Sequence, residues 1–574
     1  MSYELDNNFG IDNVDNFSDI KGVVLLDLSG QANSVIIDKK NDHIIVVGTS
    51  YANGNDFAIV KIDQNGNYVD SFKNSESDTS GVVLLDLSGG SGDYPTSVLL
   101  DDDNNIIVAG YSNANGSNDF AIVKIDQNGS YVDSFKNSES DISGVVLLDL
   151  SGGLGLSSKD RAHSVLLDDD NNIIVAGFSD AANSDYDFAI VKIDPSGKYI
   201  DSFGRDMSGN KLSGNNSDIS GVVLLDLSGS ADFSNDARSV LLDKKNGHII
   251  VVGTGVNEST DFAIVKIDQN GKYIDSFGRD MSGNKLSGNN SDISGVVLLD
   301  LSGVGLSTER AYSALLDDDN NIIVAGFSYA NGNYDFAIVK IDPSGAYVES
   351  FGRDMSGNKL SGNNSDISGV VLLDLGGSFE SAYSVLLDDD NNIIVAGTSN
   401  ANGNYDFAIV KIDQSGAYVE SFKNSDISGV VLLDLSGGAN SVVLDKKNDH
   451  IIVAGTSGDD FAIVKIDHSG AYVDSFKNSE SDTSGGVVLL DLSGGVGLST
   501  DAALSVFLDK NENIIVVGSS NANGNYDFAI VKLKLKYTKE IIRKTTRRRF
   551  YIYKGGRGSP YDEWFKKINK KINQ

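Results

Sequence analysis

The stretch Asp56-Phe-Ala-Ile-Val-Lys61 occurs eight times along the chain, and the last copy runs from Asp527 to Lys532. A second stretch, Ile-Ile-Val-(Ala/Val)-Gly, precedes each copy by about ten residues. A third stretch, Gly-Val-Val-Leu-Leu-Asp-Leu, begins at Gly22, Gly81, Gly144, Gly221, Gly295, Gly369, Gly429 and Gly486. Repeats of this kind indicate one repeat architecture, so the length of 574 residues does not by itself imply several domains.

Each unit carries four short apolar segments, which we expect to be β-strands. In the second unit they begin at Ser97, Ile106, Asp119 and Gly144. Each is rich in Ile, Val or Leu and bounded by Asn, Asp, Gly or Ser, which is typical of strands, and each is too short for an ordinary helix. The turn Asp-Asp-Asn-Asn at residues 102–105 favours an antiparallel hairpin between the first and second segments.

The second and third segments are apolar on both faces, so both faces must be covered. Small sheets stacked around an axis achieve this in a propeller. The chain starts with a fourth segment at Gly22 and ends with a unit that has only its first three. We therefore predict an all-β fold, a single eight-bladed β-propeller of four-stranded antiparallel blades whose last blade is completed by the N-terminal strand. A linear stack with exposed ends, or two separate units, is the alternative.

The repeat resembles the delta-60 repeat, a family related to the bacterial-type β-propeller repeats. The resemblance lies in Ser384-Val-Leu-Leu, Ile393-Ile-Val-Ala-Gly397, Asp406-Phe-Ala-Ile-Val-Lys-Ile412 and Tyr199-Ile-Asp-Ser-Phe-Gly204, and it covers roughly residues 5–533. The turns differ, because the family commonly has Pro-Asp-Gly where this chain has Asp-Asp-Asn-Asn. The resemblance implies a propeller-like fold and supplies no catalytic residues.

Charge divides the chain into two parts. The net charge is −35, but residues 534–574 hold 14 Lys and Arg against three Asp and Glu. We predict a β-propeller over residues 1–533 and a basic C-terminal tail over residues 534–574, partly helical or disordered. The acidic body should repel nucleic acid, whereas the tail is suited to an acidic surface or a nucleic acid. The start of the chain lacks a signal peptide pattern, so a cytoplasmic or virion-associated location is favoured over classical secretion.

No residue is assigned a catalytic, cofactor-binding or metal-ligating role. Cysteine is absent. Three of the five histidines, His43, His248 and His450, occupy turn positions, and we interpret all five as structural. Calcium is a secondary possibility at Asp/Asn-rich turns such as residues 101–105 and 63–70, which do not fit the EF-hand pattern.

The loops that differ between units should lie on one face of the ring. They are residues 93–96, 155–161, 185–186, 232–238, 304–310 and 379–383. Tyr and Arg concentrate in them, which is typical of interaction surfaces. We expect an acidic, monomeric and non-enzymatic scaffold that binds a protein or glycan partner on this face. A carbohydrate-binding or glycan-cleaving propeller is the alternative.

Overall fold

The computed structural model describes residues 2–536 apart from residues 12–15, 17, 19, 53, 75–78, 88–91, 115, 138–141, 151–158, 181–185, 228–234, 258, 302–307, 331, 425–426, 477–484, 493–499 and 523. Most of the predicted basic tail lies outside the described residues, so its character and the domain boundary at residue 533 stay predictions. The regular structure in the described part consists of β-strands, and no helix there is long and apolar enough to span a membrane.

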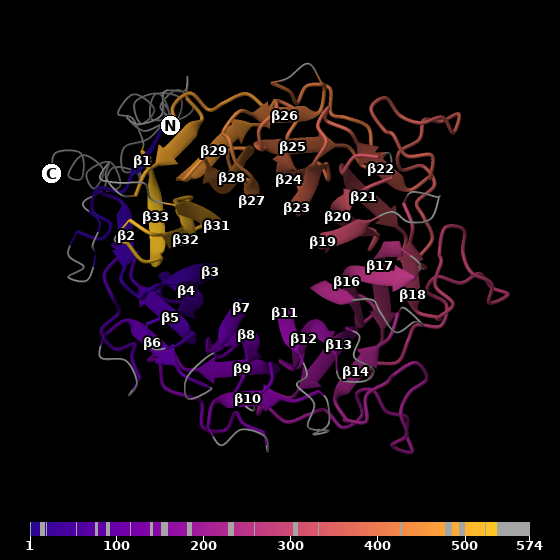
Figure 1. Cartoon of the computed structure of the whole chain (residues 1–574), viewed down its shortest axis with the longest axis horizontal. Helices are drawn as coiled ribbons and strands as arrows, with labels where there is room; N and C mark the ends of the chain where they lie inside the picture. The colour runs from indigo at the N-terminus through magenta and orange to yellow at the C-terminus, as the bar shows by residue number, and fades with distance from the viewer. Residues whose placement is uncertain are drawn as a thin grey trace, which may run out of the picture.

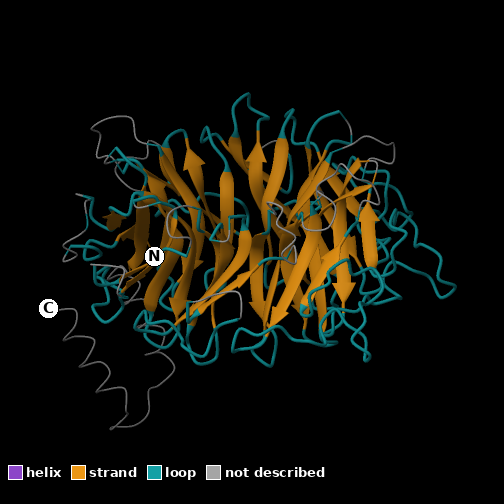
Figure 2. Ribbon diagram, turned by 60° about the horizontal axis from the view of Figure 1, so that its bottom comes forward, coloured by secondary structure: helices purple, strands orange, loops and turns teal. Residues whose placement is uncertain are grey.

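Eight small sheets surround a central axis (Figure 1). We number these blades from 1 to 8 in chain order, beginning with β3. The first strand of each blade lies nearest the axis and the fourth lies at the rim. Seen from the side, the strands of all blades form one thick disc with loops on both of its faces (Figure 2).

The strands of blades 1 to 4 are β3 Gly30–Asp38, β4 His43–Ser50, β5 Asp56–Ile62 and β6 Val82–Leu85; β7 Tyr94–Leu100, β8 Ile106–Ser112, β9 Asp119–Ile125 and β10 Val145–Leu148; β11 Arg161–Leu167, β12 Ile173–Ser179, β13 Asp187–Ile193 and β14 Val222–Leu225; and β15 Asp236–Asp243, β16 His248–Asn257, β17 Ser259–Ile267 and β18 Val296–Leu299.

The strands of blades 5 to 8 are β19 Glu309–Leu316, β20 Ile322–Ser328, β21 Asp335–Ile341 and β22 Val370–Leu373; β23 Glu380–Leu387, β24 Ile393–Ser399, β25 Asp406–Ile412 and β26 Val430–Leu433; β27 Ala439–Asp445, β28 His450–Ser457, β29 Asp460–Asp467 and β30 Val487–Leu490; and β31 Asp501–Leu508, β32 Ile514–Ser520 and β33 Asp527–Lys536, joined by β2 Val23–Leu26 and β1 Ser2–Leu5.

The blades have the predicted antiparallel order, with the four strands side by side in chain order. One row across blade 3 shows the register, since Val165 pairs with Val175, Val175 with Val191, and Val191 with Val222. The first strands begin several residues earlier than the Ser-Val-Leu-Leu-Asp segments predicted, because the pairing continues past a β-bulge. The fourth strands are shorter than predicted, since only Val-Val-Leu-Leu pairs.

The N-terminus completes the last blade, as predicted. β2 takes the fourth position beside β33, where Val23 lies opposite Val531. β1 also pairs with β33, with Leu5 opposite Leu533. The indigo N-terminal strands therefore lie beside the yellow last strand in Figure 1, and the ring has no open blade.

The core consists of eight apolar clusters, one at each junction between neighbouring blades. Side chains of one strand alternate between two clusters, because successive residues of a strand point to opposite faces. In β4, Ile45 and Val47 pack against blade 2, whereas Ile44 and Val46 pack against blade 8. Both faces of the central strands are therefore covered, and the junction of blades 8 and 1 closes the ring like the others.

The lysine that ends the repeated Asp-Phe-Ala-Ile-Val-Lys stretch is buried in all eight copies. Lys192 Nζ lies 2.9 Å from Asp168 Oδ2 in its own blade and donates to the main-chain oxygen of Gln269 in blade 4 at 3.2 Å. Lys532 of blade 8 makes the same contact with the Gln64 oxygen of blade 1 at 2.5 Å. A buried charge persists when it is paired and hydrogen-bonded. Lys61, Lys124 and Lys266 also donate to a main-chain oxygen of the following blade, so at five junctions the lysine connects two blades.

Lys192→Met should lower the free energy of unfolding by about 3–5 kcal/mol, because it leaves the Asp168 carboxylate buried without its cation. The double variant Lys192→Met/Asp168→Asn should recover part of this loss, since the uncompensated charge is gone. Urea denaturation measures both. Lys272→Met is the matched control, because the exposed pair of Lys272 with Asp275 contributes less than about 1 kcal/mol. Equal losses in Lys192→Met and the control would contradict this role.

Deletion of residues 1–28 should open the ring, because it removes β1 and β2 and leaves one edge of β33 unpaired. We expect a lower melting temperature and self-association through the exposed edge. Thermal melts and size-exclusion chromatography with light scattering measure these effects. A monomer with the melting temperature of the full chain would show that the N-terminal strands do not close the ring.

Candidate functional site

Every inner strand contains a β-bulge near its start. In β11 the register slips between Ala162 and Ser164, which leaves His163 out of the ladder. A bulge re-aims the side chain of the extra residue. The eight bulge residues are Asn33, Thr96, His163, Arg238, Tyr312, Tyr383, Asn440 and Leu504.

Six of these bulge residues line a single pocket of about 380 Å³, which we call the axial pocket. Its lining residues are Asn33, Pro95, Thr96, His163, Arg238, Tyr312 and Tyr383. The position before each bulge is Ala in seven blades and Pro in one, and the position after it is always Ser. Chemical variety is thus concentrated at the residues that face the axis.

Three bulge residues hold neighbouring inner strands together. The side-chain amide of Asn33 donates to the Pro95 oxygen of blade 2 at 2.9 Å, and the Thr96 hydroxyl donates to the Ala162 oxygen of blade 3 at 3.0 Å. Asn440 makes the equivalent bond to blade 8. In blades 3 to 6 the bulge residues instead contact other side chains: His163 and Arg238 contact Asp236, and Tyr312 contacts Tyr383.

A charged group forms one wall of the axial pocket. Arg238 Nη2 lies 2.5 Å from Asp236 Oδ2, and His163 Nε2 lies 3.3 Å from Asp236 Oδ1. Burial acts to raise the pKa of Asp236, but His163 and Arg238 together hold this pKa below its usual value. Arg238 is exposed and lines the pocket, and a guanidinium has five N–H donors, so it has donors beyond those that contact Asp236.

Aromatic side chains extend from the pocket across blades 5 and 6. Tyr312 and Tyr383 lie at its edge with ring centroids 5.3 Å apart. Contacts at 4.9–6.0 Å between centroids then connect Tyr312, Phe327, Tyr329, Tyr334, Phe379 and Tyr405. We call these seven residues the aromatic stripe. Tyr405 is 52% exposed and Tyr329 is 40% exposed, so the stripe reaches the surface.

The variable loops predicted to form the binding face contribute to this site. They supply Thr96, Arg238 and Tyr383 to the pocket and Phe379 to the stripe. Residues 155–158, 185, 232–234 and 304–307 of those loops lie outside the described residues. The sequence reasoning missed Asn33, His163 and Tyr312, which lie at the same bulge position of their strands as Thr96, Arg238 and Tyr383 but outside the predicted ranges.

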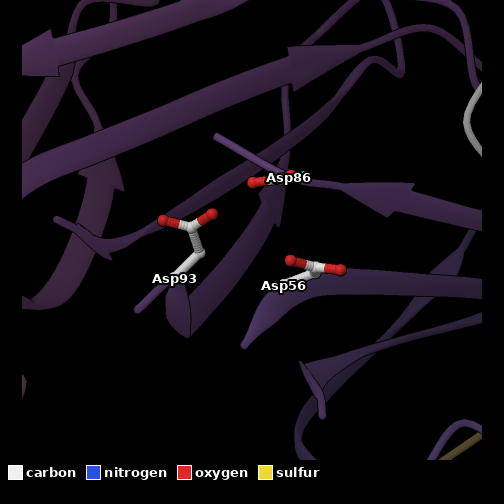
Figure 3. A group of neighbouring side chains, drawn as sticks. All are labelled: Asp56, Asp86 and Asp93. Atoms are coloured by element: carbon white, nitrogen blue, oxygen red, sulfur yellow. The ribbon is translucent and has the colours of Figure 1, made fainter. Parts of the chain in front are cut away.

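Among the described residues, the same face carries four clusters of three carboxyl groups. At the junction of blades 1 and 2, Asp56 begins β5, Asp86 follows β6 and Asp93 precedes β7, and their carboxyl groups surround a common space (Figure 3). The other clusters are Asp119, Asp149 and Asp160; Asp335, Asp374 and Glu380; and Asp460, Asp491 and Asp501. Within each cluster the oxygens lie within 4.8 Å of one another. We call these clusters the acidic triads.

Counted along the chain, the third carboxyl group is that of Asp93, Asp160 or Glu380 in three of the triads, and its pKa is strongly raised. Burial raises the pKa of Asp93 to about 6, and the nearby Asp86 and Asp56 add to the rise. Burial likewise raises the pKa of Asp160 to about 8 and that of Glu380 to about 7. A carboxylate in such a place is stable only when it is neutralised.

The Asp/Asn-rich turns that the sequence indicated for calcium lie elsewhere, and their carboxylates are engaged. Asp101 Oδ1 accepts the Asn105 N–H at 2.7 Å, while Asp101 Oδ2 lies 2.9 Å from Lys124 Nζ. Asp63 Oδ1 accepts the N–H groups of Asn65 and Asn67. Calcium binding at these turns stays a prediction.

Four segments match a family model described as a domain of unknown function (DUF5122) beta-propeller, namely residues 102–131, 244–272, 318–346 and 389–417. Each match starts in the turn after the first strand of a blade and covers its second and third strands. The chain is a beta-propeller repeat protein. The delta-60 resemblance is a finer statement than these matches support, and it stays a prediction.

No curated protein matches this beta-propeller repeat protein. Among solved structures, Drosophila Semaphorin 2a shares 11% identity over 78% of this chain and 75% of its own, with a TM-score of 0.37. The polysaccharide lyase Uly1 shares 9% identity over 88% of this chain and 90% of its own, with a TM-score of 0.36. The periplasmic gluconolactonase PpgL of Pseudomonas aeruginosa shares 11% identity over 77% of this chain and 94% of its own, with a TM-score of 0.34.

Arg238→Gln should destabilise the protein at pH 7 and have less effect near pH 3. Asp236 has a lowered pKa in the folded protein, so its charge contributes stability above the unfolded pKa of about 3.9 and this is lost as the pH falls. Arg238→Gln removes one of the two side chains that lower the pKa of Asp236. Urea denaturation at both pH values measures the difference, and Arg310→Gln, which changes an arginine of β19 outside the pocket lining, is the control. An equal loss at both pH values would contradict the Asp236 interaction.

Proposed function

We propose that the protein is a non-enzymatic interaction scaffold that binds a protein partner on the face carrying the axial pocket and the aromatic stripe. One observation carries this proposal. The chain repeats its blade almost unchanged, yet it places six kinds of side chain at the eight bulge positions around the axis. A uniform frame whose side chains vary around a pocket is suited to recognition.

The chemistry of the face favours a protein over a small molecule. Tyrosine and arginine dominate the binding energy of protein interfaces, and both are present in the arc formed by Arg238, Tyr312 and Tyr383. The aromatic stripe continues to Tyr405 on blade 6, which is a longer surface than the pocket alone. The pocket would then receive an anchor side chain of the partner, while the stripe supplies the surrounding apolar contact.

A glycan is the second candidate partner. Tyr312 and Tyr383 form an aromatic platform beside the polar side chains of Asn33, His163 and Arg238, which suits a sugar ring with hydroxyl groups. Cleavage of the glycan has less support than binding, because the Asp236 carboxyl group beside the pocket is engaged by Arg238 and His163. Glycosidases commonly need two carboxyl groups at the reacting bond.

The proposal is tested by partner capture followed by measured affinities. A partner captured by the full chain should bind at least about tenfold more weakly to Tyr312→Ala and to Arg238→Gln, because both remove central contacts of the face. Surface plasmon resonance measures the dissociation constants. Tyr526→Ala is the matched control, since Tyr526 is 44% exposed and lies outside the stripe.

A partner that binds both pocket variants as tightly as the wild-type chain would contradict the proposed face. A glycan array run with the same variants separates the two candidates. Glycan binding that Tyr312→Ala abolishes, without any protein partner, would favour the second.

Two further parts of the functional proposal rest on the sequence alone. The basic tail, residues 534–574, is proposed to contact an acidic surface or a nucleic acid. A cytoplasmic or virion-associated location is proposed for the protein. Pull-downs with and without residues 537–574, and localisation of the native protein by mass spectrometry, test these two points.

A further inference from the structure

We propose that the four acidic triads bind calcium, one ion at each triad. The ions would thereby fix the loops on the face that carries the axial pocket and the aromatic stripe, which we call the recognition face. The observations are the position of the third carboxyl group, the unpaired oxygens in the triad and the comparison with junctions that lack a triad. This inference does not depend on the identity of any partner. It concerns residues distinct from the Asp/Asn-rich turns.

In the triads of Asp93 and Asp160 the third carboxyl group accepts a main-chain hydrogen bond through one oxygen only, whereas Glu380 uses both of its oxygens, which accept the N–H groups of Leu375 and Gly377. Asp93 Oδ2 accepts the Leu87 N–H at 2.7 Å, and Asp160 Oδ2 accepts the Leu150 N–H at 3.0 Å. Both residues are 0% exposed, and their Oδ1 atoms accept no hydrogen bond of normal geometry, although the Ser112 and Ser179 hydroxyl groups lie near enough to lower the pKa of Asp93 and Asp160, respectively. Buried polar atoms are almost always satisfied in native proteins, so each such atom indicates a missing partner.

The space beside these oxygens is lined by further carboxyl groups. Asp56 is 4% exposed, its Oδ1 is also without a hydrogen-bond partner, and its carboxyl group lies beside those of Asp86 and Asp93 in Figure 3. Like charges this close repel each other. A bound cation would satisfy the unpaired oxygens and remove the repulsion at the same time. Asp86 is exposed, which gives an ion a route from solvent.

A junction without the third acid shows that this acid is not needed to build the corner. Between blades 6 and 7 the equivalent position is Gly437. There Asp406 Oδ1 accepts the N–H groups of Leu435 at 3.2 Å and Ser436 at 3.3 Å. The first acid of the corner thus takes over the amide that the third acid binds elsewhere. Asp93 and its equivalents therefore have a role beyond the corner itself.

The ligand set selects calcium. Carboxylate oxygens are hard ligands, and Ca²⁺ accepts six to eight of them in flexible geometry at about 2.3–2.6 Å. Oxygens within 4.8 Å of one another can therefore share one such ion. Mg²⁺ requires near-ideal octahedral geometry and keeps most of its water, so a triad on three separate strands suits it less.

The triads lie at the base of the loops that carry the recognition residues. In the triad of Asp335, Asp374 and Glu380, Glu380 directly follows Phe379 of the aromatic stripe. Tyr334, which precedes Asp335, contacts Phe379 with ring centroids 5.4 Å apart. An ion at this triad would hold both sides of that aromatic contact in place.

The test is calcium binding by the full chain after treatment with a chelator. Isothermal titration calorimetry with CaCl₂ should show close to four bound ions per chain, and the melting temperature should rise by a few degrees, since a ligand of the folded state stabilises it. Asp93→Asn and Asp160→Asn should each lower the number of ions by one. Asparagine keeps an oxygen for the amides of Leu87 and Leu150, so both variants should fold.

Asp434→Asn is the matched control, because Asp434 is the exposed equivalent of Asp86 at the junction that has Gly437. It should leave the number of bound ions unchanged. Excess MgCl₂ should not displace calcium at comparable concentrations. The proposal is overturned if CaCl₂ shows no saturable binding, if Asp93→Asn and Asp160→Asn keep the wild-type number of ions, or if Mg²⁺ is preferred.

Discussion

The buried lysine at the end of each third strand is the contact on which the ring depends. Its charge cannot remain uncompensated in an apolar junction, so it requires a hydrogen-bonded partner, and in five of the eight copies the partners include a main-chain oxygen of the next blade. Lys192 satisfies this requirement with Asp168 and Gln269, and Lys532 satisfies it across the closure with Gln64. The apolar clusters supply most of the burial, whereas the lysine sets how neighbouring blades are placed.

The recognition face follows from this frame. Second and third strands are buried on both sides, which leaves them no freedom to vary in chemistry. The inner strands border the axis, and a bulge in each turns one residue out of the ladder. Arg238, Tyr312 and Tyr383 therefore differ where their flanking residues remain Ala and Ser. The repeated strands fix where the bulge residues lie, and the side chains of these residues decide what the face can bind.

The acidic triads lie on the same face, at the junctions between blades. Third strands begin there with an aspartate, fourth strands end there, and inner strands start there, so carboxyl groups from three strands meet at a junction. Asp93 and Asp160 are buried in that position, and their raised pKa values report the cost of holding negative charge away from water. The loops that carry Tyr334 and Phe379 rise directly from one of these junctions.

The sequence by itself determined the strand content, the order of strands in a blade, the number of blades and the closure by the N-terminus. These follow from local pattern, because apolar segments with a fixed phase reveal which strand the last unit lacks. The binding face was also predictable in outline from the loops at residues 93–96 and 379–383.

Tertiary structure alone decided which side chains meet. His163 and Tyr312 reach one pocket only because a bulge shifts the register of β11 and β19, and a bulge depends on pairing with the neighbouring strand. Asp56, Asp86 and Asp93 belong to three strands and come together only when two blades pack. Comparison of the residue before each repeated serine could have indicated the bulge positions. The acidic triads had no such local signal, because the burial and closeness of their carboxyl groups arise from packing between segments that are distant in the chain.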